Sequence, residues 1–274
     1  MTTWILLRGL TRERAHWGEF PALLRASLPG ATVAAVDLPG NGANHGMRSP
    51  SRIEATTHSC RQQVQALALK PPYQLLAMSL GAMVAVDWAS RFPQELAGAV
   101  LVNTSLRPVS PWFHRLRPAN YARLAAAMLA GNSRFREAII LRMTSSGGSS
   151  DAQAQQDLVL DAWEGIARAH PVTRANALRQ LLAAARFEAP AQPPHVPLCV
   201  IASAGDQLVN PACSRRLASL WQADFVEHPH AGHDLPLDDG AWLAAQVAGW
   251  VRRRSEALAA HPPQFNEEAG RWMI

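Results

Sequence analysis

The chain has 274 residues, 48% of them hydrophobic and 17% charged, and carries a formal net charge of +5 at pH 7. This length and composition exclude an intrinsically disordered protein and allow one large hydrophobic core, with room for an inserted subdomain. The arginines are scattered, and only 252–254 form a cluster, on an expected terminal helix, so we expect no nucleic-acid partner.

Short apolar runs alternate with helical patterns along the first part of the chain. The expected strands are 3–7, 32–36, 73–76 and 97–102, and the expected helices are 17–27, 53–69 and a segment after Ser79. Strands separated by helices predict a mostly parallel sheet with helices on both faces, and right-handed crossovers make such a sheet doubly wound.

Between about Leu106 and Ala189 this alternation gives way to alanine-rich helical patterns, over 121–129, 135–143, 155–168 and 173–187. The serine- and glycine-rich stretch 145–150 is typical of a flexible turn. The alternation then resumes with a strand over 198–202, a helix near 211–220, a strand around Phe225, a helix from Asp238 and a loop-like tail from His261. We therefore expect three parts: the first part of an α/β core (1–105), a helical insertion (106–189) and the second part of the core (190–274).

The sequence also limits location and cofactors. No stretch approaches the roughly 20 apolar residues that span a bilayer, and the apolar stretch in 1–10 is too short for a signal peptide, with no basic residue before it. The three cysteines, Cys60, Cys199 and Cys213, lack metal-ligand spacing, and no glycine-rich phosphate loop occurs. We expect reduced thiols, a cytoplasmic location, no membrane partner, no metal and no other cofactor.

Three polar residues each follow an expected strand: Ser79, Asp206 and His233. Ligands of open parallel sheets bind beyond the carboxyl ends of the strands, so these side chains are expected at one edge. A serine hydroxyl becomes a nucleophile when an imidazole takes its proton, and a carboxylate on the other ring nitrogen orients that imidazole. The order serine, acid, histidine is that of a hydrolase nucleophile elbow.

The residues around Ser79 fit a tight strand-to-helix bend, because Ala77 and Gly81 are small where neighbouring backbone must come close. The bend places the Leu80 amide at a helix N-terminus, where it is free to donate to an oxyanion. For the second oxyanion donor we choose the Leu10 amide, after the first strand.

Five segments together resemble the α/β-hydrolase superfamily, from the first strand to the last helix: 7–10, 37–42, 77–81, 205–209 and 231–234. The resemblance implies the α/β-hydrolase fold with an inserted helical cap and a serine hydrolase similar to small carboxylesterases, lactonases, C–C bond hydrolases and prolyl aminopeptidases. Two residues depart from the family pattern. Ala77 replaces the usual first glycine of the elbow, and Arg8 stands where histidine is common. We expect Arg8 to hold the oxyanion loop or to attract an acidic substrate.

Each assignment has a plainer alternative. Ser79 is also a good helix N-cap, and Asp206 a good turn residue. The alternative acid position of this fold, after the strand ending at Val102, holds Asn103. His228 and His230 compete with His233 as the base. Candidate substrate contacts are Arg8, Met78, Trp112 and Trp163, although packing of the insertion on the core explains the two tryptophans equally well.

The leading hypothesis is hydrolysis of a small carboxylic ester, or a related small-molecule acyl substrate, through an acyl-enzyme on Ser79. The same three residues can also perform C–C bond hydrolysis, acyl transfer or perhydrolysis, because fold and triad do not determine the substrate. A ligand-binding protein on a hydrolase scaffold is the alternative outside catalysis. Monomer and homodimer are both compatible with the sequence.

Overall fold

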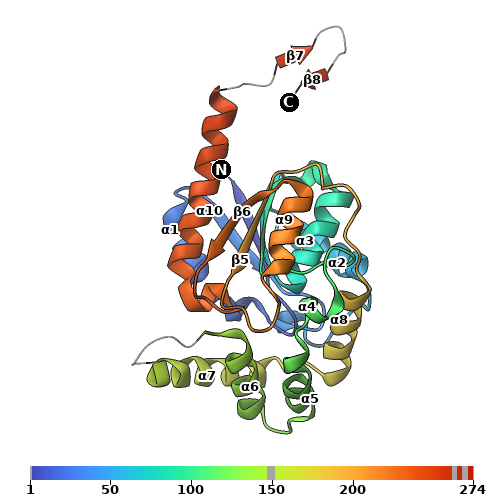
Figure 1. Ribbon diagram of the computed structural model, residues 1–274, viewed down its shortest axis with the longest axis vertical. Helices are drawn as coiled ribbons and strands as arrows, with labels where there is room; N and C mark the ends of the chain where they lie inside the picture. Colours follow the sequence, from blue (N-terminus) through green and yellow to red (C-terminus); the bar gives the residue numbers. More distant parts are fainter. Residues whose placement is uncertain (1, 147–151, 261–263, 267–270, 274) are drawn as a thin grey trace.

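The computed structural model of the protein describes residues 2–146, 152–260, 264–266 and 271–273. A six-stranded parallel sheet in the order β2-β1-β3-β4-β5-β6 forms its centre (Figure 1). The strands are β1 (Thr3–Leu7), β2 (Thr32–Val36), β3 (Tyr73–Met78), β4 (Leu96–Val102), β5 (Leu198–Ser203) and β6 (Asp224–His228).

Helices cover both faces of this sheet. On one face lie α1 (Phe20–Ser27) and α10 (Leu235–Ala260), and on the other lie α2 (Ile53–Ala66), α3 (Leu80–Arg91) and α9 (Ala212–Trp221). Because side chains alternate along a strand, β1 sends Ile5 and Leu7 into one apolar layer and Trp4 and Leu6 into the other. The expected doubly wound α/β architecture is therefore confirmed.

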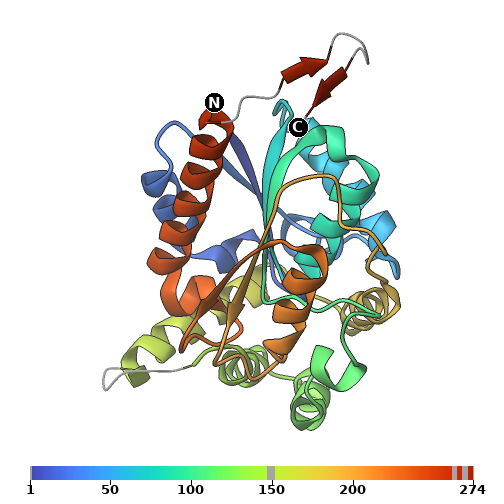
Figure 2. The ribbon, with the colours of Figure 1, turned by 45° about the horizontal axis from the view of Figure 1, so that its top comes forward.

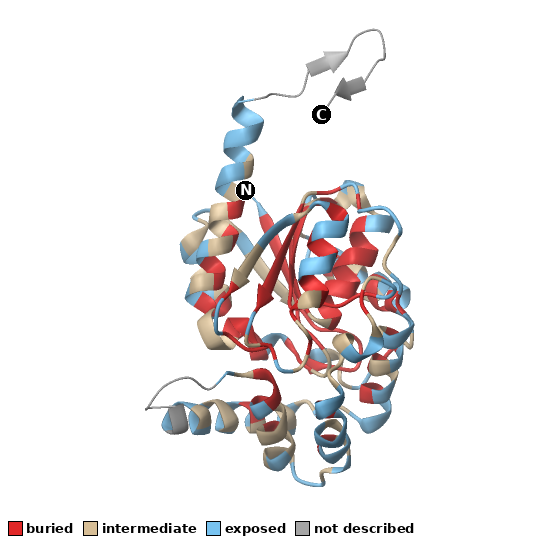
Figure 3. Cartoon of the chain, viewed as in Figure 1, coloured by how far each residue is buried: buried red, intermediate tan, exposed pale blue. Residues whose placement is uncertain are grey.

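Burial is strongest in the central strands, as Figure 3 shows. The helix α3 is buried along almost its whole length, from Leu80 to Ala89. Gly81 lets its first turn approach β1, because a Cβ there would lie 2.5 Å from the Leu7 carbonyl oxygen and 2.6 Å from that of Arg8. The start of α3 is thereby held against the loop that follows β1.

The helices between β4 and β5 lie beyond the carboxyl edge of the sheet, with α5, α6 and α7 below it in Figure 1; Figure 2 gives a second view. They are α4 (Trp112–Arg115), α5 (Tyr121–Leu129), α6 (Ser133–Thr144), α7 (Ala152–Ala169) and α8 (Arg174–Arg186). All five fall within 106–189, and α4 was not expected from the sequence. The division into three domains stays a prediction.

Several boundaries differ from the sequence-based expectation. The helix α1 begins at Phe20 rather than Trp17, because Gly18 has a φ of 53° and interrupts the preceding 3-10 turn. The helix α10 begins three residues before Asp238 and is kinked at Asp239. Residues 145–146 of the expected turn are described, and 147–150 lie outside the described residues.

The expectation of a loop-like tail is wrong where the tail is described, because β7 (Gln264–Asn266) pairs with β8 (Arg271–Met273) in antiparallel register. Across the described ranges, no helix combines the length and hydrophobicity that a bilayer crossing requires.

Candidate active site

Ser79 lies on the sharp turn between β3 and α3. Its backbone has φ 54° and ψ −117°, a left-handed conformation that is uncommon for a residue other than glycine and is strained. Hydrogen bonds hold the turn, with the Ser79 N–H donating to the Val102 carbonyl oxygen at 2.9 Å and the Thr104 hydroxyl donating to the Ser79 carbonyl oxygen at 3.3 Å. Ser79 occupies the N-cap position of α3, but its side chain makes no capping hydrogen bond.

His233 and Asp206 form a buried pair in the loops after β6 and β5. The His233 Nδ1 atom lies 2.7 Å from the Asp206 Oδ2 atom, and the two side chains are 5% and 2% exposed. The other carboxylate oxygen of Asp206 accepts hydrogen bonds from the amides of Leu208 and Val209, at 2.8 and 2.9 Å. A carboxylate partner keeps the proton on Nδ1, which leaves Nε2 as an acceptor.

The competing histidine His228 is engaged elsewhere. Its Nδ1 atom accepts from the amides of His230 and Ala231, at 3.1 and 2.7 Å, and its Nε2 atom lies 3.3 Å from the Asp239 carboxylate. Among the described residues, His233 is the only one of the three candidate histidines that contacts Asp206.

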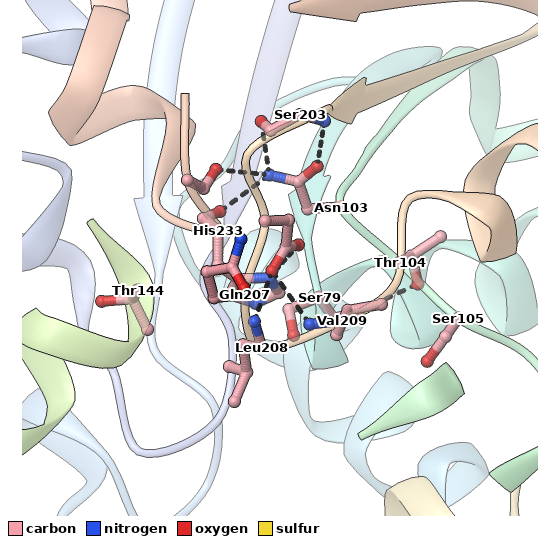
Figure 4. A network of polar contacts seen from close by, with 12 residues as sticks. Ser79, Asn103, Thr104, Ser105, Thr144, Ser203, Gln207, Leu208, Val209 and His233 are labelled. Carbon is pink, nitrogen blue, oxygen red and sulfur yellow. Dashed lines mark hydrogen bonds and ion pairs between the residues drawn. The ribbon is translucent and has the colours of Figure 1, made fainter. Parts of the chain in front are cut away.

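Asn103, at the alternative acid position, ties the loop of His233 to the sheet. Its side-chain oxygen accepts from the Ser203 amide at 2.8 Å (Figure 4). Its side-chain nitrogen donates to the Ser203 hydroxyl at 2.9 Å and to the His233 carbonyl oxygen at 2.8 Å. The sequence indicated only that Asn103 is no carboxylate, not that it holds the histidine loop.

Ser79 and His233 line the same cavity, which has a volume of about 540 Å³, including space open to solvent. The loop after β1 and the helices α5 and α6 complete its walls, with Leu124, Ile140 and Met143 among the apolar residues. No hydrogen bond joins the Ser79 hydroxyl to the His233 ring in the described part of the chain. Such bonds are often long in ligand-free enzymes and shorten when substrate binds.

The two amides chosen as oxyanion donors, those of Leu10 and Leu80, have no acceptor among the described hydrogen bonds. Leu10 lines the cavity of Ser79, and Leu80 is the first residue of α3. The loop of Leu10 is held from α8, because the Thr11 N–H donates to the Gln180 side-chain oxygen at 2.9 Å. Gln180 in turn donates to Asn41 at 2.7 Å. Nothing in the sequence pattern marked Gln180.

Arg8 and Met78 both line this cavity. The Arg8 guanidinium binds both carboxylate oxygens of Asp234, at 3.0 and 2.6 Å, and lies 4.9 Å above the Trp17 ring. Because Arg8 and Asp234 are both about 2% exposed, this cation is neutralised inside the protein. The contact joins the loop after β1 to the loop of His233.

Trp112 and Trp163 do not line the cavity of Ser79, and their contact with a substrate stays a prediction. Trp112 is 66% exposed and packs against Phe113 and Tyr121. Trp163 is buried, with its ring 4.1 Å from the Arg12 guanidinium. Helical periodicity cannot distinguish a ring that faces a cavity from one that packs beside it.

A serine on a strained strand-to-helix turn, followed in the chain by a paired aspartate and histidine at the same sheet edge, defines a hydrolase of the α/β class. A family model described as alpha/beta hydrolase fold matches residues 5–240, and the chain belongs to this family. The protein is therefore an enzyme of the α/β-hydrolase superfamily.

Relatives extend the match over nearly the whole chain. A protein of Variovorax paradoxus that is named as a carbamate hydrolase, RutD, is 31% identical over 261 residues, covering 92% of each chain. A thermophilic esterase from Thermogutta terrifontis superposes with a TM-score of 0.71 at 21% identity, over 92% of this chain and 90% of that one. The enol-lactonase of Burkholderia xenovorans superposes with a TM-score of 0.73 at 20% identity, over 92% of this chain and 91% of that one. The two structures show a shared fold.

Proposed function

We propose that this enzyme is a serine hydrolase that cleaves a small carboxylic ester, or a related acyl substrate, through an acyl-enzyme on Ser79. One observation carries the proposal: the buried contact of 2.7 Å between His233 and Asp206 belongs to a histidine that shares its cavity with the strained Ser79. A histidine oriented in this way is a suitable general base for a serine hydroxyl.

In the first half of the reaction, the Ser79 Oγ atom attacks the carbonyl carbon while its proton moves to the His233 Nε2 atom. The carboxylate of Asp206 stabilises the resulting imidazolium, and the Leu208 and Val209 amides keep that carboxylate in place. The carbonyl electron pair moves onto the oxyanion. When the oxyanion collapses, the bond to the alcohol oxygen breaks and His233 returns the proton to this leaving group.

In the second half, water attacks the acyl-enzyme and gives its proton to His233. Collapse of the second oxyanion releases the carboxylic acid and restores the Ser79 hydroxyl. The free amides of Leu10 and Leu80 are the proposed donors to both oxyanions. Losing one such donor typically reduces the rate by roughly 100- to 1,000-fold.

We propose that the insertion 106–189 acts as a cap, since residues of α5 and α6 form walls of the cavity. The proposed location is the cytoplasm, which is consistent with three buried, unpaired cysteines. No metal, cofactor, membrane or nucleic-acid partner is part of the proposal.

A carbamate is the second candidate substrate, because the relative named as a carbamate hydrolase is 31% identical. A carbamate also presents a carbonyl that serine can attack, so the same steps apply with a nitrogen-bearing acyl group. An assay panel of ester, carbamate, β-diketone and hydrogen peroxide substrates separates ester or carbamate hydrolysis from C–C bond hydrolysis and perhydrolysis.

Labelling with a fluorophosphonate, followed by peptide mapping, tests the nucleophile. We expect one adduct, on Ser79, and a loss of kcat for p-nitrophenyl butyrate on the order of 10,000-fold or more in Ser79→Ala. Ser105→Ala is the matched control, because Ser105 lies nearby but does not line the cavity (Figure 4). An adduct that persists in Ser79→Ala contradicts the assignment. Ligand binding without labelling or turnover on the whole panel would instead identify a binding protein.

A further inference from the structure

A second cavity, with a volume of about 800 Å³ including space open to solvent, adjoins the cavity of Ser79. Five residues line both cavities: Leu10, Thr11, Arg12, Leu124 and Ile140. The loop that carries the proposed oxyanion donor is thus a wall of both spaces. A substrate bound at Ser79 would have to extend past this loop to reach the second cavity.

Most of the second cavity is apolar. Residues from α5, α7 and α8 and their connections contribute, including Met128, Ile166, Val172 and Leu181. Walls of this kind suit a hydrocarbon chain, and a small number of polar groups then determine which end groups are accepted.

The charged lining is unbalanced. It consists of three arginines, Arg12, Arg136 and Arg174, and two glutamates, Glu13 and Glu137, together with two histidines. Three guanidinium groups against two carboxylates leave one positive charge in excess when the histidines are neutral. The excess favours an anionic ligand group over a neutral or cationic one.

Ion pairs within the lining identify the unpaired cation. Glu137 binds both Arg12, at 2.5 Å, and Arg136, at 3.2 Å. Glu13 lies 2.9 Å from the His170 ring. Arg174 donates to the carbonyl oxygen of Leu129 at 3.0 Å and forms no ion pair among the described residues. Because Arg174 is exposed, it lies where the cavity meets solvent.

We propose that the second cavity binds a long apolar arm of the substrate and that Arg174 binds a carboxylate at the end of this arm. The guanidinium group matches a carboxylate in shape and can donate two parallel hydrogen bonds. The inference rests on the proposed ester hydrolysis at Ser79 and narrows its substrate to esters with a carboxylate-tailed arm.

The test compares two substrates of equal chain length, p-nitrophenyl octanoate and the mono-p-nitrophenyl ester of suberate, which differ by the terminal carboxylate. We expect wild-type enzyme to prefer the suberate ester in kcat/KM and Arg174→Gln to reduce this preference about tenfold. Added salt should weaken the preference, because the contact is near solvent. The matched control is Arg186→Gln, at the exposed end of the same helix and outside both cavities, which should keep the wild-type ratio.

A second pair of substrates decides which arm of the ester enters the cavity. The butyrate ester of ω-hydroxyoctanoate carries the carboxylate on the alcohol side, and octyl butyrate is its neutral match of equal chain length. If kcat/KM for the suberate ester depends on Arg174, the acyl arm enters the second cavity. If kcat/KM for the hydroxyoctanoate ester depends on Arg174, the alcohol arm enters it. An equal effect of Arg174→Gln on charged and neutral substrates in both pairs would overturn the inference, while cleavage at Ser79 would keep the proposed function.

If no ester is cleaved, calorimetry still tests the cavity. Free suberate is the charged ligand, and free hexyl alcohol is the apolar control without a carboxylate. Tighter binding of suberate to the wild type than to Arg174→Gln, with Arg186→Gln unchanged, supports the site without any turnover. Equal binding of suberate to all three proteins, or no binding to any of them, rejects the proposed site.

Discussion

Ser79 holds a left-handed backbone, with φ 54°, that costs on the order of 1 kcal/mol or more for a residue with a side chain. Its neighbours make this conformation sterically possible. Gly81 avoids a contact of 2.5 Å with the Leu7 carbonyl oxygen, and the Ser79 amide is satisfied by Val102. The small residues Ala77 and Gly81 were visible in the sequence, which is why the bend could be predicted locally. The strained serine is exposed to the cavity as a result.

Gly9 controls the space beside the serine, which gives a prediction at a single residue. A Cβ on Gly9 would lie 3.1 Å from the Ser79 Cβ and 3.6 Å from its Oγ. Gly9 has no left-handed φ, so alanine fits its backbone but crowds the nucleophile. We expect Gly9→Ala to lower kcat/KM for p-nitrophenyl butyrate about 10- to 100-fold, with the melting temperature changed by only a few degrees.

The matched control for this change is Gly46→Ala, because a Cβ there meets nothing within 4 Å. It should keep wild-type kinetics. If Gly9→Ala is as active as Gly46→Ala, the space beside Ser79 is not limiting. If Gly9→Ala instead unfolds at a much lower temperature, the effect is structural and not local to the nucleophile.

At the scale of elements, side chains from distant segments hold the loops of the site together. Asn103 at the end of β4 fixes the His233 loop, and Gln180 of α8 fixes the loop after β1. The same His233 loop is joined to α6 where the Asp234 amide donates to the Thr144 carbonyl oxygen at 2.7 Å. The geometry of the site therefore depends on the insertion as well as on the sheet.

The ion pair of Arg8 and Asp234 is the buried charged link between two of these loops. Arg8→Met leaves the Asp234 carboxylate buried without its cation, and Asp234→Leu leaves the guanidinium without its anion. We expect each single change to lower the free energy of unfolding by about 3–5 kcal/mol, measured by urea denaturation. The double variant should lose less free energy of unfolding than the two single variants lose together, because it leaves no unpaired charge.

Arg8→Lys supplies a milder control, since it keeps the charge but loses the two-pronged geometry. It should lose less stability than Arg8→Met. Strictly additive losses in the double variant would mean that the two residues are not coupled, and the contact would then not hold the loops together.

Across the whole molecule, the parts that were predictable are those encoded by local periodicity. The strands β1 and β2 have the predicted bounds, and the expected alternation placed Ser79, Asp206 and His233 after strands of one parallel sheet. The order of strands in the sheet was not predictable, because it depends on contacts between distant segments. For the same reason the sequence could not show that Gln180 reaches Thr11, or that Trp163 packs on Arg12.

One long-range consequence of folding is the burial of His16, a polar residue near the start of the chain. Both of its ring nitrogens face donors: Nε2 lies 2.9 Å from Arg12 Nη1, and Nδ1 accepts from the Glu13 amide at 3.1 Å. The neutral ring has one N–H and can accept from only one of these donors, and a second proton would remove that remaining acceptor. Burial first, and then the charges of Arg12 and Arg8, hold the pKa of His16 well below the ordinary value of 6.5.

This lowered pKa makes the stability of the whole protein depend on pH. Below about pH 6.5 the unfolded chain binds a proton at His16 that the folded chain does not bind, so acidification favours unfolding. The His16 contribution to the free energy of unfolding should fall by up to about 1.4 kcal/mol per pH unit in this range. Burial raises the pKa of Glu13, which acts in the opposite sense, stabilising the fold at low pH and losing this effect as pH rises above about 4.5.

Urea denaturation at about pH 7.5 and about pH 5.5 isolates the histidine. We expect wild type to lose about 1 kcal/mol more over this interval than His16→Gln, which has no proton to gain there. The exposed His58 of α2 provides the control, and His58→Gln should follow the wild-type pH dependence. The absolute stability of His16→Gln does not enter, because only the change with pH is compared. Identical changes in wild type and His16→Gln would show that His16 takes up its proton as readily in the folded protein as in the unfolded chain.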